Sequence, residues 1–172
     1  MIRRKPVAIV LLCATVTSIW SHGPSRLKVS ESITIAASPE TVWKRIQDFS
    51  SLHWHPYVES SEATGGNQAG AVRAVHLTGS GTIIEELTAH SMEKRSLSYE
   101  MKNPGPLPVS DYSSSITVNA KGNGSVVEWR GQFYCGDPNN DPAPECNDDV
   151  AIEVVSDIYQ EGLSELKKQI EK

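Results

Sequence analysis

Two histidines in the segment Leu52-His53-Trp54-His55-Pro56-Tyr57 are the first residues that suggest chemistry. In an extended segment, side chains two residues apart point the same way, so His53 and His55 have the spacing of zinc or copper ligands. No third ligand lies nearby, because His76 and His90 belong to other segments. The alternative is a loop whose imidazoles hydrogen-bond to backbone carbonyls, and we assign no metal site.

The same segment has the composition of a cover over a cavity. Pro56 disfavours a helical conformation at His55, so this part of the chain is a loop. With Trp54 and Tyr57 it is too aromatic for an ordinary solvated loop. We therefore expect the loop to cover the mouth of a cavity, with Trp54 and His55 among the residues that contact a ligand.

Arg73 and Glu85 form the second candidate site. They lie on two predicted strands joined by Gly79-Ser80. A two-residue loop would pair Arg73 with Glu86, whereas a three-residue loop would pair it with Glu85. If Glu85 faces the concave side, its partly desolvated carboxylate can act as a base or hold a ligand hydroxyl. The alternative is a cross-strand ion pair at the sheet surface, contributing about 0.2–1 kcal/mol.

Aromatic side chains on three later strands form the third group. Tyr99, Tyr112, Trp129 and Tyr134 can line a cavity with ring faces and a few hydroxyls, or can belong to the core. The sequence has no Ser-His-Asp order, glycine-rich phosphate loop, Cys-x-x-Cys pair or dinucleotide fingerprint. It therefore indicates no cofactor, and we assign no catalytic residue.

The N-terminus has the features of a secretory signal. Arg3, Arg4 and Lys5 precede an uncharged, mostly apolar run over 7–19, which is too short to span a bilayer comfortably. We expect a signal peptide over 1–21, with an approximate cleavage site, followed by one domain over 22–172; the alternative is an uncleaved anchor helix. Cleavage leaves 13 of the 16 basic residues against 21 acidic ones, a net charge of −8. This balance argues against a nucleic-acid or anionic membrane partner and favours basic partners.

Two cysteines remain after cleavage. Cys135 and Cys146 enclose a loop with three prolines. In an oxidising compartment we expect a disulfide between them, which the chain-entropy model values at about 2–3 kcal/mol. The alternatives are two buried thiols and, less favoured by the nearby residue types, a metal pair.

Alternating apolar residues and turn signals predict the elements that position these groups. Ser38, Pro39 and Glu40 have the residue types that begin a helix, and Val42, Ile46 and Phe49 form its apolar stripe. The predicted strands are 26–35, 58–63, 71–78, 82–89, 96–102, 109–120 and 125–135. Short connections between successive strands indicate an antiparallel sheet.

The C-terminal segment predicts a long helix capped at Asn147 or Asp148. Its apolar residues cover more than half of its circumference, which indicates a curved sheet wrapped around it, and Gly162 allows a close neighbour. We therefore predict an α+β fold: a curved antiparallel sheet of about seven strands around this helix, with one or two short helices after the first strand. The remaining space is the candidate site.

Several motifs resemble the SRPBCC superfamily and, within it, the polyketide cyclase/dehydrase-like branch. They are VWKRIQDFSSLHWHP from Val42, GAVR from Gly70, GTIIEEL from Gly81, RSLSY from Arg95, PLPVSDY from Pro106 and VVEW from Val126. The resemblance covers nearly the whole mature chain and implies a START-like helix-grip fold with an internal cavity. Three further features resemble the MxaD family of periplasmic proteins: the mature start HGP from His22, the run ATGGN from Ala63, and FY from Phe133 followed by the Asn- and Pro-rich loop over 139–145.

The resemblance to the MxaD family implies a non-catalytic, periplasmic accessory role in methanol oxidation, with methanol dehydrogenase and its cytochrome c as partners. Two alternatives remain: a protein that binds or transports a small apolar ligand, and a cyclase- or dehydratase-like enzyme. The enzyme would use Glu85, Tyr99 or His55 as an acid or base, and it requires a strongly shifted titration in a closed pocket. The predicted ligand-binding residues are Trp54, His55, Arg73, Glu85, Tyr99, Tyr112 and Trp129.

Overall fold

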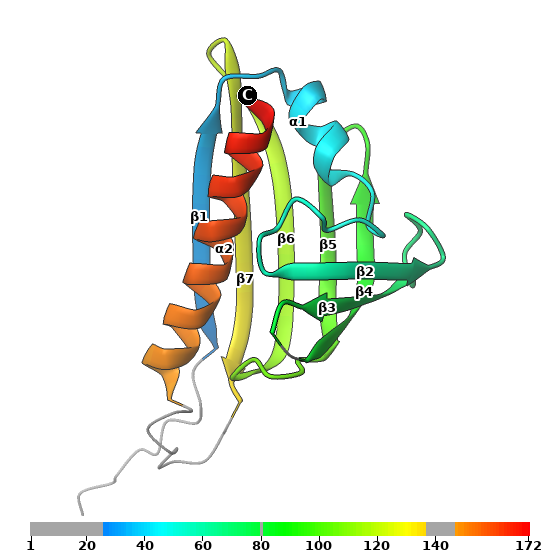
Figure 1. The fold of residues 1–172 in the computed structure, drawn as a ribbon, viewed down its shortest axis with the longest axis vertical. Coiled ribbons are helices and arrows are strands. Elements are labelled where there is room, and N and C mark those ends of the chain that lie inside the picture. Colours follow the sequence, from blue (N-terminus) through cyan, green and yellow to red (C-terminus); the bar gives the residue numbers. More distant parts are fainter. Residues whose placement is uncertain (1–25, 80, 137–146) are drawn as a thin grey trace, which may run out of the picture.

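A single antiparallel sheet forms the body of the molecule (Figure 1). The computed structural model describes residues 26–79, 81–136 and 147–172. Strand order across the sheet is β1-β7-β6-β5-β4-β3-β2. The strands are β1 (Leu27–Ile35), β2 (Val58–Thr64), β3 (Val72–Leu77), β4 (Thr82–Ser91), β5 (Ser96–Asn103), β6 (Val109–Lys121) and β7 (Gly124–Cys135).

Helix α1 (Pro39–Ile46) begins where the sequence predicts. The Ser38 hydroxyl accepts a hydrogen bond from the Thr41 N–H at 3.3 Å, and Pro39 occupies the first turn. Val42 and Ile46 are buried, as the apolar stripe requires. Phe49 is also buried but lies beyond the end of the helix, so the chain has already left the helix there, ahead of the cover loop over 52–57.

The sheet is strongly curved, because extra residues interrupt the strand pairing. Extra residues occur in β2, β4, β5 and β6, and such bulges increase local twist and bend. As a result, β2 runs across the direction of the longer strands (Figure 1). Buried residues alternate along β6 and β7, as predicted, and line the concave face.

Helix α2 (Asp148–Ile170) lies against one side of the concave face. The Asn147 side chain caps it by accepting from the Val150 N–H at 3.0 Å. The helix packs on β1 and β7 at one edge of the sheet and leaves the concave side of β3 to β6 partly uncovered (Figure 1). The predicted α+β helix-grip fold is therefore confirmed, with one short helix after the first strand.

Two predictions fall on residues outside this description. The signal peptide over 1–21 lies outside the described residues, and so does Cys146. Cys135 is buried at the end of β7, and its disulfide with Cys146 stays a prediction. Within the described ranges, neither helix has the length and apolar character needed to cross a membrane.

Candidate functional site

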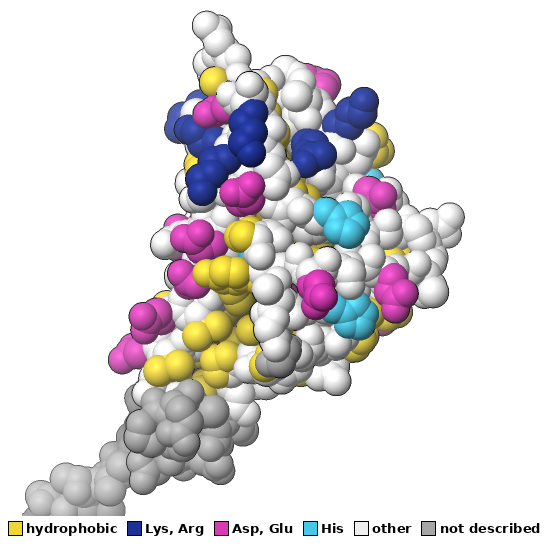
Figure 2. Space-filling model, in the orientation of Figure 1, with side chains coloured by type: hydrophobic (Ala, Val, Ile, Leu, Met, Phe, Trp, Pro, Cys, Tyr) yellow, Lys and Arg dark blue, Asp and Glu magenta, His cyan; other side chains and the backbone are white. Residues whose placement is uncertain are grey.

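A cavity of about 540 Å³ lies between the concave face of the sheet, α2 and the loop over 52–57. Most of its wall is apolar, with side chains from every surrounding element: Leu52, Ile83, Met101, Leu107, Val155 and Ile158. Hydrophobic side chains gather beside α2 on the surface that Figure 2 shows, bordered by acidic side chains. At the mouth, the Tyr57 hydroxyl donates to Asp157 of α2 at 2.8 Å and so joins the loop to the helix.

The cavity brings together five of the seven predicted ligand-binding residues: His55, Glu85, Tyr99, Tyr112 and Trp129. Trp54 is not part of the lining, because its indole turns into the core and meets the Trp129 ring edge-on at 5.6 Å between centroids. Arg73 also lies outside the lining, where it supports Glu85.

The charged pair of this site is Arg73 and Glu85, on β3 and β4. The two residues are direct cross-strand partners, so the connection between these strands is the longer of the two alternatives. Glu85 Oε2 accepts from Arg73 Nε at 2.9 Å and from Arg73 Nη2 at 2.5 Å. Arg73 is 3% exposed and Glu85 is 5% exposed. Glu85 therefore faces the concave side, as the first alternative has it, and the ion pair of the second alternative is present but buried, not at the sheet surface.

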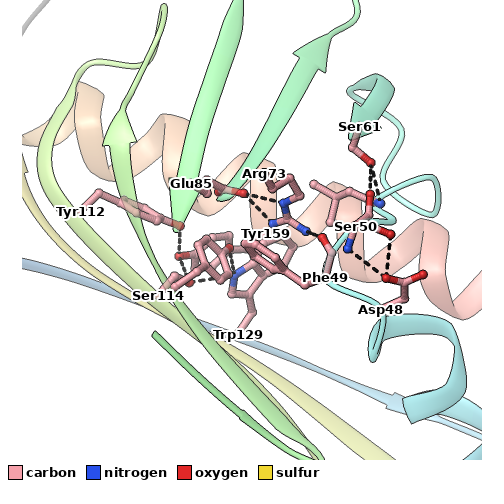
Figure 3. Close-up of polar contacts among 12 residues, drawn as sticks. Asp48, Phe49, Ser50, Ser61, Arg73, Glu85, Tyr112, Ser114, Trp129 and Tyr159 are labelled. Carbon is pink, nitrogen blue, oxygen red and sulfur yellow. Dashed lines mark hydrogen bonds and ion pairs between the residues drawn. The ribbon is translucent and has the colours of Figure 1, made fainter. Parts of the chain in front are cut away.

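Arg73 also connects the sheet to the segment that follows α1. Its Nη1 donates to the Phe49 carbonyl at 2.8 Å, and its guanidinium lies 4.3 Å from the centroid of the Phe49 ring (Figure 3). Three N–H groups of Arg73 therefore donate to the Glu85 carboxylate and the Phe49 carbonyl, and both of these residues are buried. Breaking such a buried pair costs about 3–5 kcal/mol, because one charge is left without a partner.

His55 is a neutral, fully bonded imidazole. Its Nε2 lies 2.9 Å from the Ile158 carbonyl, which only accepts, so Nε2 carries the proton. Its Nδ1 accepts from the Tyr57 N–H at 3.1 Å. Burial lowers the pKa of His55 to about 4, helped by the positive charge of Arg73 and opposed by the bond to Ile158. The ring therefore stays uncharged at neutral pH.

The metal interpretation of the His-x-His spacing receives no support from this geometry. His53 is exposed, whereas His55 is buried with both nitrogens engaged, so the two rings do not converge. In the described part of the chain, no three His, Cys, Asp or Glu side chains come together as a metal site. His55 instead fixes the cover loop against α2, which is the backbone-bonding alternative.

Beside the charged pair lies a hydroxyl cluster, which comprises Tyr99, Tyr112, Ser114, Trp129 and Tyr159 (Figure 3). Ser114 is its centre: its hydroxyl donates to the Arg130 carbonyl at 2.8 Å and lies 2.9 Å from Trp129 Nε1 and 3.0 Å from the Tyr159 hydroxyl. Tyr112 also bonds to Tyr159, and Trp129 Nε1 also donates to Tyr99 at 3.1 Å.

Burial keeps the tyrosines of this cluster protonated. It raises the pKa of Tyr99 to about 12, and the nearby Glu85 carboxylate adds to this effect. The pKa values of Tyr112 and Tyr159 are raised well above their ordinary value by the same desolvation. With His55 also neutral, the arrangement is suited to hold a neutral polar group of a ligand.

Tyr159 is the main cavity residue that the sequence does not single out. In the sequence it is one of the apolar positions of the long helix, yet it lines the cavity and stacks on Trp129 at 4.3 Å between ring centroids. A signal existed at Gly131, because glycine inside a strand often marks a close approach. A Cβ atom at residue 131 would overlap the Tyr159 hydroxyl.

Gly162 fulfils the expectation of a close neighbour on the long helix. A Cβ atom there would lie 2.5 Å from Cδ2 of His55 and 3.0 Å from the Trp129 ring. The glycine thus lets the cover loop approach α2 closely enough for the His55–Ile158 hydrogen bond.

The chain is similar to one protein-family model and to several solved structures. Residues 26–171 match the family model described as polyketide cyclase/dehydrase and lipid transport. The structure of the protein XoxI from Bacillus cereus is similar, with 34% identity and a TM-score of 0.73, covering 84% of this chain and 96% of that one. An uncharacterized protein from Bacillus thuringiensis gives 34% identity and a TM-score of 0.72, covering 85% and 100%. No curated protein sequence matches the chain.

A more distant structural likeness concerns the fold alone. Ara h 8.0201 shares 16% identity with a TM-score of 0.66, covering 85% of this chain and 98% of the other. The curved sheet around a C-terminal helix is therefore shared by proteins whose sequences differ widely.

Proposed function

We propose that this chain, which belongs to the polyketide cyclase/dehydrase and lipid transport family, binds a small apolar molecule in its cavity. The observation that carries the proposal is the cavity itself. It has about 540 Å³ of space, a mainly apolar wall, and a few converging polar groups from the sheet and α2. Pockets of this size and composition are typical small-molecule sites.

Binding without catalysis agrees best with the protonation states. A general acid or base works best with a pKa near the working pH. The pKa values of His55, at about 4, and Tyr99, at about 12, are both moved away from neutrality. The cyclase- or dehydratase-like alternative then depends on Glu85, whose Oε2 is already held by Arg73.

Ligand binding is tested by filling the cavity. Met101 lines the cavity, whereas Met92 is 60% exposed, so Met101→Trp and Met92→Trp form a matched pair. We expect a panel of apolar molecules to raise the melting temperature of the wild-type protein and of Met92→Trp, but not of Met101→Trp. A ligand at a hundred times its Kd adds about 2.7 kcal/mol to stability. Equal shifts in both variants would place binding elsewhere.

A second function rests on the acidic side of α2 and on the resemblance to the MxaD family. Asp149, Glu153, Asp157 and Glu161 recur every four residues along the exposed face of the helix. Such a stripe complements a basic protein surface and guides its approach in a salt-dependent way. We therefore include an accessory role in periplasmic methanol oxidation, between methanol dehydrogenase and its cytochrome c, as the second candidate.

The accessory role has a separate test. With a purified methanol dehydrogenase and its cytochrome c, the protein should change the rate of electron transfer at low salt and lose this effect at high salt. Asp149→Asn combined with Glu161→Gln should weaken the effect, whereas Glu59→Gln combined with Glu62→Gln on β2 should preserve it. Fractionation of cells that make the full chain tests the periplasmic location, and a cytoplasmic product would contradict this role.

A further inference from the structure

Two polar groups of the cavity wall have a hydrogen-bonding position that no other group of the described residues fills. They are the hydroxyl proton of Tyr99 and the Oε1 atom of Glu85, and both residues line the cavity. Buried polar groups are normally paired, so unused capacity facing a cavity indicates the chemistry of what enters it.

The free proton of Tyr99 follows from the order of hydrogen bonds in the hydroxyl cluster. The Arg130 carbonyl only accepts, so Ser114 must donate its single proton there. Ser114 therefore accepts from Tyr159, and it shares the single N–H of Trp129 with the Tyr99 oxygen. Since Tyr159 donates its proton to Ser114, it accepts a hydrogen bond from Tyr112. Every proton of the cluster is then assigned except that of Tyr99.

Tyr99 itself takes part in the cluster only as an acceptor. Trp129 Nε1 donates to the Tyr99 oxygen at 3.1 Å, and the neighbouring Ser114 hydroxyl already accepts from Tyr159 and Trp129, so none of the hydrogen bonds seen among the described residues takes the Tyr99 proton. Tyr99 is 3% exposed, so bulk water does not take that role at the outer surface. The hydroxyl thus offers one donor to an occupant of the cavity.

Glu85 supplies the complementary acceptor. Both bonds from Arg73 reach Oε2, which leaves Oε1 without a protein donor in the described ranges. The two groups are neighbours, because the Arg73 guanidinium that binds Glu85 also lies 5.5 Å from the centroid of the Tyr99 ring. Glu85 and Tyr99 lie on adjacent strands, where Leu87 pairs with Tyr99 and Glu85 pairs with Met101.

From this pairing we infer that the ligand is an apolar alcohol or phenol, whose hydroxyl donates to Glu85 Oε1 and accepts from the Tyr99 hydroxyl. A hydroxyl is the smallest organic group that does both. A ketone or ether uses only the tyrosine, and a hydrocarbon leaves both groups unpaired, which costs affinity in a buried site. The inference rests on the proposed binding function and specifies its ligand class.

Three molecules of similar size test the inference: 4-butylphenol, 4-butylanisole and butylbenzene. Titration calorimetry with the wild-type protein should give affinities in that order, with the phenol bound at least about tenfold more tightly than butylbenzene. Tyr99→Phe should reduce the preference for the phenol over butylbenzene by about threefold to tenfold, the value of one neutral hydrogen bond. Tyr134→Phe is the matched control and should keep the preference, because it removes a tyrosine hydroxyl that does not line the cavity.

The outcomes separate the two levels of the proposal. If none of the three molecules binds, the proposed binding function fails and the inference fails with it. If all three bind equally, or if Tyr99→Phe and Tyr134→Phe change the preference equally, the cavity binds apolar molecules but the hydroxyl assignment is wrong. A preference lost only in Tyr99→Phe supports it. Circular dichroism of each variant confirms that the fold is retained.

Discussion

The two polar groups beside the cavity differ in charge: one is an ion pair, and the other is a set of neutral hydrogen-bonding side chains. The charged pair, Arg73 and Glu85, lies on β3 and β4 and holds full charges away from water. The hydroxyl cluster spans β5, β6, β7 and α2 and consists of neutral groups only. A buried ion pair fails severely when one partner is lost, whereas a neutral hydrogen bond contributes about 0.5–1.5 kcal/mol.

This difference assigns distinct roles to the two groups. The charged pair joins the two strands to the Phe49 carbonyl and so holds the cover loop in place. The hydroxyl cluster joins the sheet to α2 through Tyr159. The first group is therefore a rigid support, and the second is a wall whose hydroxyls can be exchanged one at a time.

The largest effect is expected from Glu85→Ala. Arg73 would remain buried without its counter-charge, so the free energy of unfolding should fall by about 3–5 kcal/mol in urea titrations. Glu100→Ala is the control, because Glu100 is exposed on β5 and forms a surface ion pair with Lys102; its loss should stay below about 1 kcal/mol. Comparable losses in the two variants would remove the distinction between the charged pair and surface ion pairs.

The next effect concerns acid stability, which depends on His55. This residue lies between the two groups, edge-on to Trp129 and near Arg73. The unfolded chain binds a proton at its ordinary pKa of 6.5, and the folded chain does so only near 4. The unfolded state therefore binds more protons in that window, and stability should fall by about 3 kcal/mol as the pH is lowered from 6.5 to 4.

Unfolding in urea at several pH values measures this dependence. His55→Gln removes the titrating ring and should flatten the curve between pH 6.5 and 4. His53→Gln, at an exposed position two residues earlier, should leave the curve unchanged. A curve that keeps its slope in His55→Gln would assign the acid sensitivity to other groups.

A third effect tests how tightly the hydroxyl cluster is packed. Gly131→Ala would place a methyl group on the Tyr159 hydroxyl, and overpacking of this kind costs about 1–3 kcal/mol. Removing that hydroxyl in Gly131→Ala/Tyr159→Phe should recover part of the loss. The double-mutant cycle measures the coupling between the two sites. Additive losses would show that the contact with Tyr159 does not limit residue 131.

The sequence predicted the strands and both helix starts because these depend on local signals. Ser38 and Asn147 cap the helices as expected, and alternation places Tyr112, Ser114 and Val118 on the concave face. The end of α1 was less predictable, since the apolar stripe continues to Phe49. The chain leaves the helix there because Asp48 accepts from the Ser50 N–H and Asn67 accepts from the Phe49 N–H.

The site was only partly predictable, because it depends on register and on contacts between distant segments. Gly79-Ser80 fits loops of two lengths, and only the fold shows that Arg73 opposes Glu85. Trp54 was assigned to ligand contact, yet the loop turns its ring toward Trp129. Tyr159 resembles a core residue in any periodicity analysis, since its hydroxyl acquires a role only when Gly131 of another element makes room for it.

The smallest effect is expected from Tyr112→Phe, and it tests whether the hydroxyl cluster tolerates single losses. Tyr159 would lose one donor but keep its bond to Ser114, so the free energy of unfolding should fall by about 0.5–1.5 kcal/mol. Ser114→Ala removes the group that joins Tyr159, Trp129 and Arg130 and should cost more than Tyr112→Phe. If Tyr112→Phe instead costs as much as Glu85→Ala, the neutral cluster is as indispensable as the charged pair, and the contrast between a rigid support and an exchangeable wall is wrong.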